Sequence, residues 1–87
     1  LERAHDGAAA AALARQAWRL SPAETALLRA LLRGQTPQDF ADARRVRIRT
    51  VRTQLSALLL KTGAARQQDL VALVARLLLL APDKLQN

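Results

Sequence analysis

The sequence contains no cysteine, methionine or tyrosine, and only three glycines, three prolines and two aromatic residues. Without cysteine there is no disulfide framework and no thiolate metal site, and one histidine cannot complete a zinc finger. Strands favour β-branched and aromatic residues, whereas 19 alanines and 18 leucines make up 37 of the 87 residues here. The composition therefore predicts an all-α fold.

Long apolar runs are also missing. No run reaches the roughly 18–20 residues of a membrane span, and no charged, apolar and cleavage regions combine into a secretion signal. We therefore expect no membrane partner and a cytoplasmic location. Because the chain starts at Leu1 and lacks methionine, we also expect it to be the C-terminal piece of a longer protein.

Acidic residues are scarce, and positive charge dominates. Twelve arginines and two lysines outweigh seven acids and give a net charge of +7. A small, strongly basic helical domain is most often attracted to nucleic acid and less often to an anionic membrane. The acids, the histidine and the two serines form no paired carboxylates or nucleophile–base arrangement, so we expect no catalytic site, cofactor or small-molecule ligand.

The first part of the chain predicts one helix. Residues 1–7 have mixed charge and a glycine, which is typical of a frayed terminus, and His5 there is interpreted as a solvated side chain. Helix propensity rises from Ala8, and we expect Trp18 to be a packing residue. The expected apolar stripe consists of Leu13, Ala14, Ala17 and Trp18.

Two further helices carry strong start signals. Ser21 can cap a helix, Pro22 suits its first position, and Glu24 completes a capping box. The sequence from Thr36 to Asp39 repeats the pattern and predicts a short helix that ends near Arg44 or Arg45. The first of these helices buries Leu27, Leu28, Leu31 and Leu32, and Gly34 is placed to end it.

Residues 48–62 predict an amphipathic helix with two different faces, closed by Gly63. One face is apolar, with Ile48, Val51, Leu55, Leu58, Leu59 and Thr62. The other carries guanidinium and hydroxyl groups near the helix start, from Arg49, Arg52, Thr53 and Ser56, which suits a helix lying in a DNA major groove. A short turn between this helix and the preceding one indicates a helix-turn-helix.

Five arginines surround the predicted turn, and no acid follows Asp42 within this segment. A solvated basic face is one interpretation. We favour contact with DNA phosphates, because positive charge near a helix start opposes the helix dipole and does not add stability. This arginine cluster consists of Arg44, Arg45, Arg47, Arg49 and Arg52.

The last predicted helix begins near Arg66 and carries more apolar residues than one stripe needs. The surplus has two interpretations that the pattern leaves open, a self-association face or a well-buried C-terminal helix. We expect the helix to end at Ala81-Pro82. Its apolar positions are Leu70, Val71, Leu73, Val74, Leu77, Leu78, Leu79 and Leu80.

The order and spacing of several short motifs resemble the LuxR/GerE-type helix-turn-helix domain over residues 20–79. They are Leu20 to Glu24, then Gly34, Phe40-Ala41, Thr50 to Leu55, and Lys61 to Gly63. The resemblance implies a four-helix, dimeric DNA-binding domain of a bacterial transcription regulator, here with an additional N-terminal helix. We accordingly expect a linker and helix over 1–19, the domain over 20–80 and a tail over 81–87.

The resemblance also implies roles for residues, and nucleoid association. Base-reading positions of the family fall on Arg52, Thr53 and Ser56, beside which we place Arg49. Phosphate-contacting positions fall on Thr36, Thr50, Gln54 and Lys61, to which the arginine cluster adds Arg45 and Arg47. The last helix would form the homodimer contact, through Leu70, Val74, Leu77 and Leu78.

Three residues depart from the family. The family commonly has glycine in the turn, where this chain has Arg45, and a positive φ there would cost on the order of 1 kcal/mol. It commonly has a serine or threonine cap where this chain has Arg47, and losing that cap costs about 1 kcal/mol. Leu60 stands on the outward face, where the family usually has a polar or basic residue.

Two other functions are compatible with the sequence. A sigma-factor-like helix-turn-helix would bind promoter DNA while docked on RNA polymerase, with Leu60 and the last helix serving the docking. A degenerate helix-turn-helix would instead bind protein through the same apolar surfaces, and the absent cap and turn glycine favour it.

Overall fold

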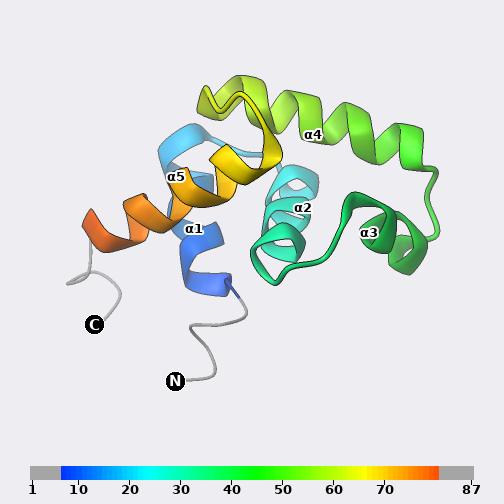
Figure 1. The fold of residues 1–87 in the computed structure, drawn as a ribbon, viewed down its shortest axis with the longest axis horizontal. Coiled ribbons are helices and arrows are strands. Elements are labelled where there is room, and N and C mark those ends of the chain that lie inside the picture. Colours follow the sequence, from blue (N-terminus) through cyan, green and yellow to red (C-terminus); the bar gives the residue numbers. More distant parts are fainter. Residues whose placement is uncertain (1–6, 81–87) are drawn as a thin grey trace.

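The fold was analysed in a computed structural model that describes residues 7–80. Within these residues the chain forms five helices and no strand, which confirms the all-α prediction (Figure 1). His5 and the predicted end of the last helix at Ala81-Pro82 lie outside the described residues. The helices are α1 (Ala8–Trp18), α2 (Pro22–Leu32), α3 (Pro37–Arg44), α4 (Ile48–Thr62) and α5 (Gln67–Leu80).

Both predicted capping boxes are present. In α2 the Glu24 amide donates to Ser21 Oγ over 3.1 Å, and the Ser21 amide donates to Glu24 Oε1 over 2.9 Å. In α3 the Thr36 hydroxyl and the Asp39 carboxylate exchange the same bonds at 3.0 Å each. Because these bonds satisfy amides that a helix start leaves unpaired, α2 and α3 begin where the sequence predicts.

Helix α2 occupies the centre of the molecule, in contact with α1, α3 and α4. Helix α4 extends along one side of the fold, and α1 lies on the opposite side (Figure 1). Helix α5 packs on α1 and also contacts α4. None of the helices within residues 7–80 combines the length and the hydropathy needed to cross a membrane.

One core joins all five helices. Its largest fully buried side chains come from α2, α4 and α5, and Phe40 of α3 and small residues of α1 complete it. These fully buried side chains are Leu27, Leu28, Val51, Leu58, Leu70 and Val74.

The buried face of α1 differs from the predicted stripe. Ala10, Ala11 and Ala14 are buried, Trp18 is half-buried against the core as a packing residue, and Ala17 is exposed. The helix approaches its neighbours so closely that a methyl group added at Gly7 would lie 2.8 Å from Leu32 Cβ. Alanines therefore form the contact because larger side chains would hold α1 away from α2 and α5.

Burial in the last helix, α5, contradicts part of the predicted dimer contact. Leu70 and Val74 are completely buried within the chain, where they pack in the core with α1 alanines. A side chain without accessible surface cannot touch a second molecule unless the fold opens. The prediction was wrong for these two residues because the pattern could not show that α1 packs on α5.

Candidate nucleic-acid interface

Helix α4 has the two faces that the sequence predicts. Val51 and Leu58 are completely buried, and Ile48, Leu55, Leu59 and Thr62 are half-buried beside them. On the opposite face an outward row of four side chains is exposed, with no neighbouring helix over it: Arg49, Arg52, Thr53 and Ser56.

The outward row has the length of a short DNA site. From Arg49 to Ser56 the helix advances seven residues, or roughly 10 Å, which equals about three base pairs of a B-form duplex. Leu60 is 84% exposed and follows Ser56 one turn later on the same face. The row therefore ends in an apolar side chain at the far end of α4.

The outward row contains three residue types: arginine, which is charged, and threonine and serine, which carry hydroxyl groups. An arginine can donate two parallel hydrogen bonds to a guanine edge, as Arg52 could. The Thr53 hydroxyl donates to the carbonyl oxygen of Arg49 over 3.1 Å, which leaves its methyl group available for a thymine methyl. Ser56 is exposed and can donate or accept.

The turn before α4 is strained at Arg45, where this chain lacks the glycine that the family commonly has. Arg45 ends α3 with φ 58° and ψ 41°, a left-handed conformation in which glycine is the usual residue. Arg47 begins α4 and offers no side-chain hydrogen bond to the first turn. Three residues, 45 to 47, thus join α3 to α4 without the local stabilisation that both capping boxes supply elsewhere.

All members of the arginine cluster are exposed, and within residues 7–80 none of them forms an ion pair with an acidic side chain. The nearest acid in sequence, Asp42, instead accepts a hydrogen bond from Gln38 Nε2 over 2.9 Å. Arg44 lies over the Phe40 ring, with its guanidinium carbon 5.0 Å from the ring centre. The positive charge of the turn is therefore available to an anionic partner.

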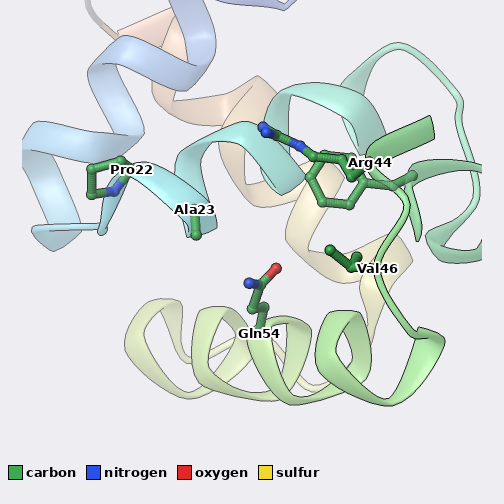
Figure 2. A pocket seen from close by; sticks show the side chains of 6 residues that line it. Pro22, Ala23, Arg44, Val46 and Gln54 are labelled. Atoms are coloured by element: carbon green, nitrogen blue, oxygen red, sulfur yellow. The ribbon is translucent and has the colours of Figure 1, made fainter. Parts of the chain in front are cut away.

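A groove of about 370 Å³ lies beside α4, between the start of α2 and the end of α3, and Figure 2 shows the side chains that line it. Gln54 extends from α4 into this groove, in the direction of Ala23. Thr50 and Thr36 are exposed, and the Thr36 oxygen already accepts the Asp39 amide. The predicted phosphate-contacting residues therefore do not share one environment. Gln54 lies on the side of α4 that faces the start of α2, and Thr50 and Thr36 are exposed.

Lys61 has a different environment from the arginines. Its Nζ donates to Glu24 Oε1 over 2.7 Å, and Glu24 is only 8% exposed. This hydrogen bond lowers the pKa of the Glu24 carboxyl below its ordinary value, the Ser21 amide lowers it further, and burial opposes both. Sequence reasoning missed the pair because nothing in the pattern links two residues that lie 37 positions apart.

The end of α5 keeps apolar surface that the core does not cover. Leu77 and Leu78 are half-buried, and Leu79 is 77% exposed. Of the four residues predicted to form a dimer contact, Leu77 and Leu78 thus remain accessible, whereas Leu70 and Val74 do not.

No protein-family model, curated protein or solved structure matches this chain.

Proposed function

We propose that this chain is a sequence-specific DNA-binding domain, which reads the major groove with α4 and belongs to a bacterial transcription regulator of the LuxR/GerE type that its motifs resemble. One observation carries the proposal. The outward row is exposed, and it starts at the second residue of α4, directly after a three-residue connection in which Arg45 and Arg47 have no acidic partner within residues 7–80. A helix that presents donors to base edges beside cations for the backbone suits a duplex.

The division of roles follows from placement. Arg52, Thr53, Ser56 and Arg49 would contact base edges, and Arg45, Arg47, Thr50 and Thr36 would contact the backbone. The arginines attract the duplex whatever its sequence, because each phosphate contact releases bound counterions. The outward row then selects among sequences through hydrogen bonds and methyl contacts.

A second copy would extend the site. We propose that the accessible end of α5, including Leu77 and Leu78, contributes to a homodimer whose half-sites lie about one helical turn apart. Burial of Leu79, which is 77% exposed, would then accompany dimer formation.

Exposure of Leu60 supports a second candidate function. An 84% exposed leucine on the outward face suits a protein partner better than it suits a phosphate, which favours the degenerate helix-turn-helix that binds protein. Under this alternative α4 binds protein, and random duplex DNA should show no salt-sensitive binding to the chain.

The test is a titration of random duplex DNA at several salt concentrations. Arg47→Gln should reduce the slope of log affinity against log salt by about one. The matched control is Arg15→Gln, which removes the same charge from an exposed position on α1, a helix that contributes no residue to the proposed interface. Equal slopes for the two variants would contradict the proposed interface, and no salt-sensitive binding by the wild type would favour the protein-binding alternative.

A further inference from the structure

The last turn of α4 is tied to the first turn of α2 by a partly buried ion pair. Lys61 Nζ donates to Glu24 Oε1 over 2.7 Å and to the carbonyl oxygen of Arg19 over 3.4 Å. The same carboxylate oxygen accepts the Ser21 amide of the capping box. Lys61 thus joins the end of α1, the start of α2 and the end of α4.

This pair differs from the other ion pair between described residues. Arg66 and Asp69 lie three positions apart, their nitrogen and oxygen are 3.5 Å apart, and their side chains are 69% and 44% exposed. In the Lys61–Glu24 pair the Glu24 side chain is only 11% exposed. Removing one partner from a shielded pair leaves an uncompensated charge, so Glu24 needs Lys61 in a way that Asp69 does not need Arg66.

The position of Lys61 on α4 separates it from the base-reading Arg52 but not from the flank of the helix. Lys61 follows Arg52 by nine residues, which at 3.6 residues per turn places it about 180° from Arg52 and on the same side of α4 as Thr50, so its pairing with Glu24, and not its angle, sets it apart from a phosphate contact. Its neighbour Leu60 is the residue that continues the outward row. A phosphate reached by Lys61 would require the ammonium group to leave Glu24.

We infer that Lys61 is a positioning residue for α4 and not a phosphate contact. A contact away from the helix axis fixes how α4 is rotated about that axis relative to α2, and this rotation determines where the outward row points. The inference rests on the proposed function and deepens it, because it states what keeps the base-reading face in register with the rest of the domain.

The sharpest test uses Glu24→Gln, because a charge effect and a positioning effect predict different changes in DNA binding. Removing an acid makes the domain more positive, so charge alone should strengthen binding to any duplex. If the pair positions α4, the variant should instead lose preference for the best duplex from a random-library selection over random duplex, by roughly tenfold. The control is Asp42→Asn, which removes an exposed acid near the turn and should strengthen binding to both duplexes.

The salt dependence of Lys61→Gln gives a second readout. A positioning residue leaves the slope of log affinity against log salt equal to that of the wild type, whereas a phosphate contact would reduce it by about one. Lys61→Arg keeps the positive charge opposite Glu24 and should retain most of the preference for the selected duplex. A reduced slope in Lys61→Gln, or stronger and equally selective binding by Glu24→Gln, overturns the inference.

A measurement without DNA separates this inference from the proposed function. Urea unfolding of the 87-residue chain as wild type, Glu24→Gln, Lys61→Gln and the double variant should show that the two substitutions are not additive. Additive effects overturn the positioning role even if DNA binds. Coupled residues in a chain that binds no duplex overturn the proposed function, and with it the role in DNA recognition.

Discussion

The two ends of α4 are built in opposite ways. At the C-terminal end Gly63 adopts φ 79° and donates its amide to the Leu59 carbonyl over 2.8 Å, and Lys61 is paired with Glu24. At the N-terminal end Arg47 offers no cap, and Arg45 takes a left-handed conformation. One end follows the usual rules of helix termination, and the other departs from them at two positions.

The N-terminal end of α4 is the less stable of the two by local criteria. A left-handed arginine costs about 1 kcal/mol and a missing cap about 1 kcal/mol, and cations at a helix start add an unfavourable term. None of these arginines has a compensating acidic partner within residues 7–80. A duplex placed against this end would supply the missing negative charge, so the weak end of α4 is the end that we propose to bind.

The largest change in stability is expected from the buried face of α4. Leu58 is completely buried in the middle of the C-terminal half of α4, and Leu58→Ala should lower the free energy of unfolding by about 2–5 kcal/mol. Urea denaturation measures it. The control Leu60→Ala truncates an 84% exposed leucine of the same helix and should change stability little. Similar losses in both variants would show that the two faces of α4 are assigned incorrectly.

The next effect concerns recognition at the N-terminal half. Arg52→Ala should weaken binding to the selected duplex by about 1–3 kcal/mol and remove discrimination at one base pair. Competition titrations against duplexes substituted at single positions measure this. Arg15→Ala on α1 is the control for loss of charge alone. A uniform loss over all the duplexes would reassign Arg52 to the backbone.

Replacing the strained turn residue should separate stability from binding. Arg45→Gly relieves the left-handed conformation and should raise the free energy of unfolding by about 1 kcal/mol, while affinity for random duplex falls with the lost charge. Arg33→Gly is the control, because Arg33 ends α2 with φ −84° and has no such strain. Destabilisation of Arg45→Gly would contradict the comparison of the two ends.

A smaller effect is expected from restoring the cap. Arg47→Ser places a hydroxyl at the N-cap of α4 and should stabilise the fold by about 0.5–1 kcal/mol, again with weaker binding to random duplex. Thermal unfolding and a duplex titration measure the two effects. The control substitution in α3, a helix that already has a capping box, is Thr36→Ser, which should leave stability nearly unchanged because the box is preserved. Loss of stability in Arg47→Ser would show that the arginine has a stabilising partner.

The Lys61–Glu24 pair at the C-terminal end of α4 should make the free energy of unfolding decrease in acid. The pKa of Glu24 is lowered in the folded state by its bonds to Lys61 and Ser21, so its contribution to stability is complete above its unfolded pKa of about 4.5. That contribution is lost as the pH falls through the lower, folded value. Urea unfolding from pH 6 to pH 3 should show a steeper loss for the wild type than for Glu24→Gln. Parallel curves would remove the pair as the source of this dependence.

The sequence predicts the local features of the fold well. Both capping boxes and the glycine at the end of α4 follow from residue types at fixed offsets, and each is confirmed. The two faces of α4 follow from its periodicity. These features depend on residues close together in the chain, where spacing alone determines which groups meet.

Contacts between distant segments could not be predicted in the same way. The pattern does not show that α1 packs on α5, and this packing buries Leu70 and Val74. The interpretation of Lys61 as a phosphate contact came from the family resemblance and could not include Glu24, 37 positions away. Both cases depend on how helices meet, and helix propensity and periodicity carry no information about that.

The central claim is that the exposed face of α4 reads DNA sequence. Selection of bound duplexes from a random library by the wild-type chain tests it most directly. We predict a two-fold symmetric motif in which each half-site has three or four specified base pairs, the length covered by Arg49 to Ser56. A bound pool that stays as random as the starting library would contradict the claim.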